Sequence, residues 1–230
     1  MNHIINISEP LPLFVMPSVV LFPGADLPLF IQQPTYEAML LDAAEGNGLV
    51  AFALQKSRFA DIDNHGVPLD RIHRIGCIGR IAAHRSMNGG GISAYIRGTR
   101  KIMLLDEASS FPYRRVFVEI LNEDNDQLEL MRIFDAREDI MRLFMDSSIQ
   151  NLLDPIPRGT LDRISQVSIE NFVPLAAALL RLTPSERQQL LEDDPLQRME
   201  RLLDRFREKL LYSTTLGDGM HYLLGEEMTH

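Results

Sequence analysis

The chain has 230 residues, of which 45% are hydrophobic, and a formal net charge of −9. This composition excludes a disordered chain and allows one large or two small domains. The whole charge excess lies in the second half, since residues 1–121 hold 11 basic and 11 acidic side chains and residues 122–230 hold 12 and 21. An acidic field repels phosphates, so general nucleic-acid binding is disfavoured.

The sequence also favours one cellular setting. Cys77 is the only cysteine, which excludes an internal disulfide and suits a reducing cytoplasm. The start at Met1–Asn6 lacks a basic region and a cleavage site, so no secretory signal is expected. No apolar run reaches the roughly 18 residues of a membrane span. We therefore expect a cytoplasmic protein without membrane partners.

Two short strands are predicted at the beginning of the chain. The apolar runs Leu11–Val15 and Leu27–Ile31 are bounded by Pro or Gly, as short buried strands are. Between them, the pair Pro23-Gly24 suits a sharp turn, because Gly24 tolerates a positive φ. Five prolines in about twenty residues exclude a long helix and restrict the strands to sheet edges, strand starts or bulges. The stretch is typical of two strands that cross at the corner of a small barrel.

A helix and a third strand follow this corner. Over residues 34–45 the apolar side chains recur at helical spacing, with Pro34 in the first turn and Gly46 after the last one. Leu49–Leu54 is predicted to be a buried strand. The polar stretch from Gln55 to Asp70 is predicted to be a surface loop.

Three more strands complete the β-rich part. They are expected over Ile75–Ala83, over Ile92–Gly98 with a continuation at Arg100–Leu105 after a bend, and over Phe111–Leu121. The stretch Met87–Gly91 contains Asn-Gly, the strongest short hairpin signal, between two of these strands. We expect a hairpin tip there.

The pattern becomes helical after a charged connection. Apolar residues recur every three or four positions from Gln127 to Met145, and a second helical stretch covers Leu161–Arg181, with possible divisions near Ser168 and Pro174. Residues 183–186 form a capping box that opens a short helix over Ser185–Glu192. The last helix is expected over Pro195–Tyr212.

These elements predict an organisation into two domains. We expect a β-rich domain over residues 1–121, a connection over 122–126, a helical bundle over 127–216 and a loose tail over 217–230.

Several of these segments, in this order, resemble the amino-terminal substrate-binding domain of the ATP-dependent Lon protease. The resemblance begins with the opening corner, Leu11–Ile31. It continues through Arg74–Ile81, Ala94–Ile102 and Pro112–Glu119, and it ends with the helix-loop-helix Leu175–Glu192. The ordered set covers nearly the whole chain, and it is specific although each segment alone is weak.

The resemblance implies an α+β fold, in which an amino-terminal pseudo-barrel of β-strands (PUA-like) with one or two helices precedes a carboxy-terminal helical bundle. It also implies a role in binding polypeptides. The chain contains no Gly-x-x-x-x-Gly-Lys-Ser/Thr phosphate loop, and none of its three lysines (Lys56, Lys101, Lys209) lies in sequence that resembles the Lon Ser–Lys peptidase site. We therefore expect a free-standing protein of this kind, without the ATPase and peptidase domains.

The leading hypothesis is a non-catalytic binding module that captures exposed apolar segments of other proteins. Its expected partners are unfolded or partly unfolded polypeptides, with a protease or its substrates as further candidates. The expected surface is an apolar groove where the barrel meets the helices. Candidate contact residues, chosen as exposed positions, are Phe59 in the long loop, Met87 in the hairpin tip, and Phe111 and Tyr113 beside Pro112.

Two other classes stay open. A hydrolase with an unrecognised site would need converging His, Asp or Glu side chains in a cleft. An RNA-binding barrel would need a continuous positive face over the region Arg97–Arg115, although pairing with neighbouring carboxylates is the simpler expectation for these basic residues. The six histidines show no metal-ligand spacing, and Cys77 lies in an apolar strand. We assign no catalytic, cofactor-binding or metal-binding residue and expect no cofactor.

Overall fold

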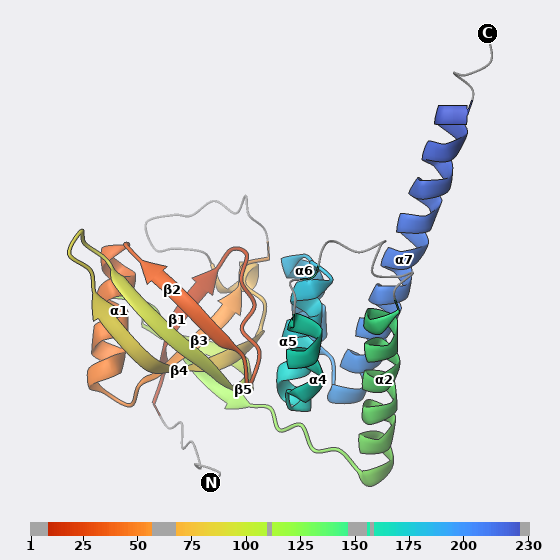
Figure 1. Ribbon diagram of the computed structural model, residues 1–230. Helices are drawn as coiled ribbons and strands as arrows, with labels where there is room; N and C mark the ends of the chain where they lie inside the picture. The colour runs from red at the N-terminus through yellow and green to blue at the C-terminus, as the bar shows by residue number, and fades with distance from the viewer. Residues whose placement is uncertain (1–8, 57–67, 110–111, 147–155, 157–158, 226–230) are drawn as a thin grey trace. The chain divides into compact units, whose positions relative to one another are not determined.

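A computed structural model describes residues 9–56, 68–109, 112–146, 156 and 159–225 of the chain (Figure 1). Contacts divide these residues into two compact units. Unit 1 is the described part of Met1–Glu123 together with Thr183–Glu192, and unit 2 is the described part of Asp124–Leu182 and Asp193–His230. The class is α+β, with a six-stranded mixed sheet and six α-helices in the described residues. Within the same ranges, no helix is both long and apolar enough to cross a membrane.

The sheet of unit 1 closes on itself. Its order is β2-β5-β4-β3-β1-β6, and β5 also pairs with β6, so five strands form a ring and β2 extends it at β5. β1 and β3 are parallel, and the helix α1 (Pro34–Glu45) lies between them in the chain, as a parallel pair requires a crossover. All other pairs are antiparallel. The strands are β1 (Leu11–Met16), β2 (Asp26–Ile31), β3 (Leu49–Leu54), β4 (Ile75–Ser86), β5 (Ile92–Ser109) and β6 (Arg115–Ile120).

Two apolar clusters form the core of unit 1. The first draws side chains from all five strands of the ring, including Leu13, Ala51 and Ile102. The second joins the sheet to α1 and includes Phe14 and Phe52, whose rings stack with centroids 5.0 Å apart. Because successive side chains of a strand point to opposite faces, β1 and β3 contribute to both clusters. This is the reason that both strands read as unbroken apolar runs.

Several local predictions for this part are confirmed. The helix α1 has the expected bounds, and Gly46 follows it as the C-cap. Gly24 has the positive φ, 78°, that the Pro-Gly turn predicts. The hairpin tip lies where the Asn-Gly signal places it, between the end of β4 and the start of β5. Cys77 is fully buried in β4.

The edge position of β2 agrees with its proline. The Gly98 amide donates to the Ala25 carbonyl, and hydrogen-bonded and non-hydrogen-bonded pairs alternate along the β2–β5 ladder from there. Pro28 and Tyr95 are therefore a non-hydrogen-bonded pair. The backbone of Pro28 then faces away from β5, where the missing N–H removes no ladder bond. The proline is therefore tolerated because this strand lies at the edge of the sheet.

Other strand bounds differ from the prediction. β5 is assigned as one strand from Ile92 to Ser109 rather than as two pieces, but its register with β4 shifts between Gly98 and Arg100, so a β-bulge lies at the expected bend. At Gly98 the Phe22–Ala25 turn crosses the strand, and the Gly24 amide donates to the Gly98 carbonyl at 2.9 Å. β6 begins at Arg115 rather than at Phe111. Most of the expected surface loop, residues 57–67, lies outside the described residues.

The short helix α6 (Pro184–Glu192) belongs to unit 1, although it comes from the helical half of the sequence. The predicted capping box starts it, with reciprocal bonds between Thr183 and Glu186. The buried Gln188 donates to the Ile75 carbonyl at 2.9 Å, and Glu192 contacts His73 Nδ1 at 2.9 Å. Side-chain contacts with the barrel therefore fix the position of α6.

Unit 2 consists of α2 (Gln127–Met145), α4 (Thr160–Gln166), α5 (Ile169–Leu179) and α7 (Pro195–Gly225). Between α2 and α7, the rings of Phe144 and Phe206 are in contact with centroids 4.5 Å apart. The predicted division at Ser168 is confirmed, whereas Pro174 lies inside α5. The helix expected to end at Tyr212 continues to Gly225, across much of the expected tail. A helical bundle over 127–216, separated at 122–126, stays a prediction.

Candidate functional site

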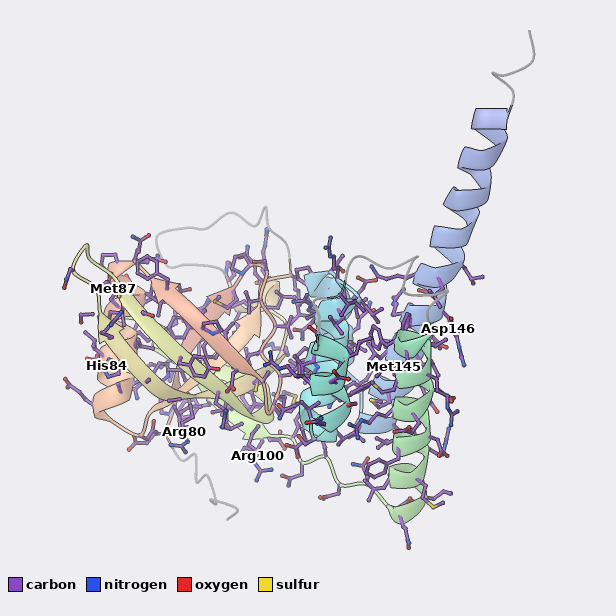
Figure 2. All side chains as sticks on the ribbon, viewed as in Figure 1. Arg80, His84, Met87, Arg100, Met145 and Asp146 are labelled. Carbon is purple, nitrogen blue, oxygen red and sulfur yellow. The ribbon has the colours of Figure 1, made fainter. Side chains whose placement is uncertain are left out.

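The structure describes two of the four residues that were predicted to contact a polypeptide. Phe59 and Phe111 lie outside the described residues. Met87 lies at the hairpin tip and is exposed, as expected (Figure 2). Tyr113 was expected to be exposed, which is wrong, because only 6% of its surface is accessible. Its ring packs in the second core cluster.

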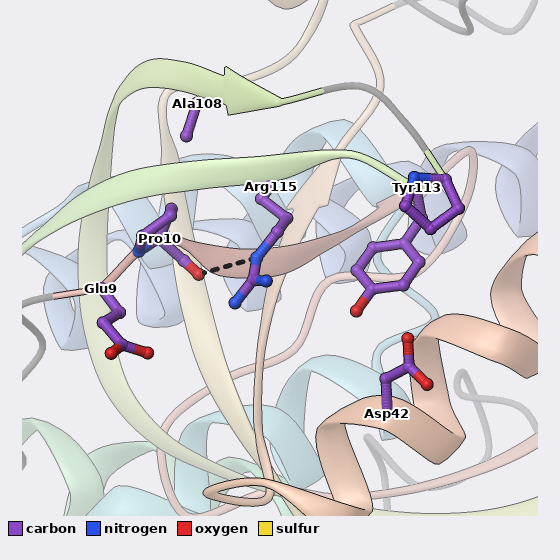
Figure 3. Close-up of a pocket in the computed structure, with 7 residues that line it drawn as sticks. Glu9, Pro10, Asp42, Ala108, Tyr113 and Arg115 are labelled. Carbon is purple, nitrogen blue, oxygen red and sulfur yellow. Dashed lines mark hydrogen bonds between the residues drawn. The ribbon is translucent and has the colours of Figure 1, made fainter.

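Tyr113 instead forms one wall of a pocket in unit 1 of about 560 Å³ (Figure 3). Burial and the neighbouring Asp42 carboxylate raise the pKa of the Tyr113 phenol. On the opposite wall, Arg115 Nε donates to the Pro10 carbonyl at 3.2 Å. These polar contacts join the segment before β6 to α1, and the first residue of β6 to the residue before β1, so the pocket is better explained as a structural joint than as an apolar groove. Its lining residues are Glu9, Pro10, Asp42, Ala108, Pro112, Tyr113 and Arg115.

A different surface of unit 1 exposes large apolar side chains. On β2 the side chains alternate, with Pro28 and Phe30 exposed and Leu27, Leu29 and Ile31 turned toward the second core cluster. Pro28 lies opposite Tyr95 of β5 in the ladder, and residues directly opposite each other share a face. Phe30 is 57% exposed and Tyr95 is 42% exposed. We call the solvent side of β2, of Ser93–Arg97 in β5 and of Arg80–Arg85 in β4 the outer face.

The hairpin tip adjoins this outer face. Gly90 and Gly91 have φ values of 87° and 86°, a region of backbone conformation that favours glycine. A Cβ atom at Gly91 would lie 3.1 Å from Cζ of Phe30 and 2.7 Å from the Ile31 oxygen. The Phe30 ring therefore rests against the backbone of the tip. Met87, 37% exposed, begins the same turn and accepts the Gly90 amide on its carbonyl.

Charged side chains lie at both ends of the outer face. At one end Asp26 and Arg97 form a bidentate pair at 2.7 and 2.8 Å, and this pair lowers the pKa of Asp26. Arg80 lies opposite Arg97 in the ladder. At the other end Arg85 lies opposite Ser93. The outer face thus combines a central apolar strip with cationic ends.

The basic residues weighed for RNA binding do not form a continuous positive face. Lys101 is buried and lies 3.1 Å from Glu123, and Arg114 forms a bidentate pair with Glu107. The latter is one of the pairings with neighbouring carboxylates that were expected. Within the described ranges, no three His, Cys, Asp or Glu side chains are placed to hold a metal ion.

The apolar pattern of residues 131–145 divides between core and solvent. Ile140, Met141 and Phe144 are buried in unit 2, whereas Met131 and Phe134 are exposed. The larger part of the pattern is thus core, and the groove expected where the barrel meets the helices stays a prediction.

Sequence reasoning missed Phe30 and Tyr95. The run Asp26–Ile31 reads as almost uniformly apolar, which suggests a strand that is buried on both faces. The available signal was the alternation of Asp26, Pro28 and Phe30 with three aliphatic residues. A charged residue and a proline on one side of a strand indicate a side that faces solvent.

The support of Phe30 by the hairpin tip can be tested with two alanines. Gly91→Ala is expected to lower the free energy of unfolding by about 2 kcal/mol, because it adds a steric contact with Phe30 and Ile31 to the strain of a positive φ. Gly90→Ala has the same φ with open space around it, so it should lose about 1 kcal/mol. Urea titration measures both. Equal losses would show that the Gly91–Phe30 contact contributes nothing.

Known proteins match this chain over most of its length. The family model "ATP-dependent protease La (LON) substrate-binding domain" matches residues 10–207. The Lon protease of Dictyoglomus thermophilum is 24% identical over 206 residues, which are 88% of this chain and 25% of that protein. The Lon protease of Trichlorobacter lovleyi is 26% identical over 87% of this chain and 24% of that protein. The chain thus spans about a quarter of the length of these curated relatives.

A solved structure has the same fold. The amino-terminal domain of the Mycobacterium avium complex Lon protease aligns with a TM-score of 0.62 and 18% identity, over 86% of this chain and 98% of that one. At this identity the likeness concerns the fold alone. The family match over 10–207 carries the assignment: the chain belongs to the family of the ATP-dependent protease La (LON) substrate-binding domain.

Proposed function

We propose that this protein binds polypeptide segments through the outer face, with Phe30 and Tyr95 as the main contacts. Membership of a substrate-binding family supports the kind of partner. The observation that carries the location is the pair of exposed aromatic rings on one side of the sheet edge. Unfolded or partly unfolded proteins are the fitting partners, because they expose the apolar side chains that folded proteins bury. A protease or its substrates are candidates among them.

The physical basis of the binding is apolar burial on a rigid support. The sheet holds both rings at positions set by the ladder, so little ordering of the protein is needed when a segment binds. At about 25 cal/mol per Å², covering roughly 100 Å² of each ring contributes about 2.5 kcal/mol. Two such contacts give weak binding to any one short segment. Weak binding suits a module that takes many sequences.

This mechanism requires no catalytic group. Among the described residues, the pKa shifts that are resolved fall on side chains with a structural explanation, such as Asp26 beside Arg97 and Tyr36, which is buried against β1. We therefore propose binding rather than hydrolysis. A cytoplasmic setting stays part of this proposal.

Replacement of both aromatic residues tests the location. The double variant Phe30→Ser/Tyr95→Ser is expected to bind a fluorescent, permanently unfolded protein at least tenfold more weakly, since about 1.4 kcal/mol corresponds to a factor of ten. Fluorescence anisotropy measures the affinity, and circular dichroism checks that the fold persists. Neither side chain is part of the buried core, so only modest destabilisation is expected.

Phe117→Ser is the matched control, because Phe117 is an exposed aromatic residue of β6 that lies outside the outer face. It should leave the affinity unchanged. The proposal fails if the double variant binds as well as the unchanged protein, or if Phe117→Ser weakens binding as much.

A further inference from the structure

The cationic side chains of the outer face are arranged at a regular distance around its apolar centre. Arg85 lies opposite Ser93 and Arg80 lies opposite Arg97, while Tyr95 is halfway between these two positions of β5. Four residues of an extended strand span about 13 Å, at 3.3–3.4 Å per residue. Residues 93, 95 and 97 of β5 and their partners on β4 thus form three cross-strand rows, each two residues from the next. Each outer row contains an arginine, and the middle row contains the Tyr95 ring.

These arginines are not neutralised in the same way. Arg97 is engaged by the Asp26 carboxylate through two bonds. Arg85 has only a 3.7 Å contact with Met87 Sδ, and Arg80 has a 3.4 Å bond to the Asn47 carbonyl. Neither Arg80 nor Arg85 has a carboxylate partner in the part of the chain that the structure describes. Both retain donors that fit a carboxylate in a bidentate manner.

We propose that the outer face selects extended segments in which an apolar residue has a carboxylate two positions before it and another two positions after it. This inference rests on the proposed function and names its substrate class. In an extended segment the residues i, i+2 and i+4 point to the same side and span the same 13 Å or so. When the apolar side chain covers Tyr95 and Phe30, the flanking carboxylates reach Arg85 at one end and Arg80 at the other.

The net charge of the chain does not oppose this selection at short range. The excess of −9 lies entirely in residues 122–230, and residues 1–121 are neutral overall. Salt at physiological strength screens exposed charges over about 8 Å, so ion pairs formed in direct contact on the outer face are weakened less than the long-range repulsion from the net charge. The net charge of −9 disfavours RNA more than a peptide with two carboxylates, because RNA carries a negative charge at every nucleotide.

Peptides of identical composition test the spacing. In the fluorescent peptide Ser-Asp-Ser-Phe-Ser-Asp-Ser, both carboxylates lie on the same side of the extended chain as the Phe ring. In Ser-Ser-Asp-Phe-Asp-Ser-Ser, both carboxylates lie on the opposite side. We expect the first peptide to bind three- to tenfold more tightly by anisotropy in low salt, and we expect this ratio to fall as salt is raised. Arg85→Gln and Arg80→Gln should each reduce the ratio toward one, while Arg71→Gln, an exposed arginine outside the outer face, should leave it unchanged.

The outcomes separate this inference from the proposed function. If both peptides bind equally and Phe30→Ser/Tyr95→Ser abolishes their binding, the charge selection is overturned and the binding surface stands. If neither peptide binds and unfolded protein also fails to bind, both are overturned. If a labelled oligouridylate binds more tightly than either peptide and Arg80→Gln and Arg85→Gln abolish that binding, the outer face recognises phosphate, and the peptide inference is overturned.

Discussion

Lys101→Met is expected to lower the free energy of unfolding by about 3 kcal/mol, the low end of the range for breaking a buried ion pair. Only 7% of the Lys101 side chain is accessible, and its Nζ lies 3.1 Å from Glu123 Oε1. The same ammonium donates to the Glu192 carbonyl at the end of α6, also at 3.1 Å. Methionine keeps the length of the side chain and removes the charge, so a largely buried carboxylate loses its cation and the last turn of α6 loses a donor.

The consequences extend to the position of α6. Lys101 belongs to β5, and Glu192 belongs to a helix that is 91 residues further along the chain. Hydrogen exchange should therefore show faster exchange in α6 for Lys101→Met than for the unchanged protein. Urea titration gives the change in stability.

Two variants serve as controls for this prediction. Arg142→Met breaks an exposed pair with Asp139 on α2 and should change stability by no more than about 0.5 kcal/mol. Lys101→Met/Glu123→Gln also removes the Glu123 charge and should recover part of the loss. Equal effects of Lys101→Met and Arg142→Met would contradict the interpretation of Lys101 as a buried, paired cation.

Gly98→Ala is expected to lower the free energy of unfolding by about 3 kcal/mol, the upper end of the usual range for overpacking. A Cβ atom at this position would overlap the Phe22 carbonyl oxygen and lie 2.9 Å from the Phe22 carbonyl carbon and 3.3 Å from Cys77 Sγ. The neighbours are largely backbone atoms, which cannot rotate away as the end of a flexible side chain can. The turn that contains Phe22 would have to move off β5 and lose the bonds between Gly98, Gly24 and Ala25.

Gly89→Ala provides the comparison, because a Cβ atom there meets nothing within 4 Å and Gly89 has no positive φ. It should leave stability unchanged or raise it by a few tenths of a kcal/mol through the lower entropy of the unfolded chain. Thermal unfolding followed by circular dichroism distinguishes the two variants. Similar midpoints for Gly98→Ala and Gly89→Ala would contradict the close approach of the Phe22 turn to β5.

Features that depend on nearby residues could be predicted from the sequence. The bounds of α1, the start of α6 at its capping box and the hairpin at Met87–Gly91 all follow from side-chain and backbone interactions over a few residues. The family resemblance rested on the order of such features, and the match over residues 10–207 bears it out.

Features that depend on distant neighbours could not be predicted in this way. Tyr113 follows a proline in a polar stretch and was expected to be exposed, yet α1 and the second core cluster cover it. Lys101 appeared to belong to a basic patch, whereas Glu123 and α6 enclose it. At Gly98 the sequence indicated the irregularity, which is a register shift with β4, but not the close approach of the Phe22 turn.

The difference between features set by nearby residues and features set by distant neighbours is clearest at the candidate site. By itself, the sequence determined that Leu27–Ile31 is a strand and that its proline restricts it to a sheet edge, a strand start or a bulge, because both depend on the backbone of the strand alone. Only the tertiary structure decided that Phe30 faces solvent beside Tyr95, because the ladder register pairs β2 with β5 and the second core cluster buries only one side of that pair. An apolar side chain can be buried or exposed, and its identity alone does not distinguish the two. Its exposure depends on which elements of the chain pack against it.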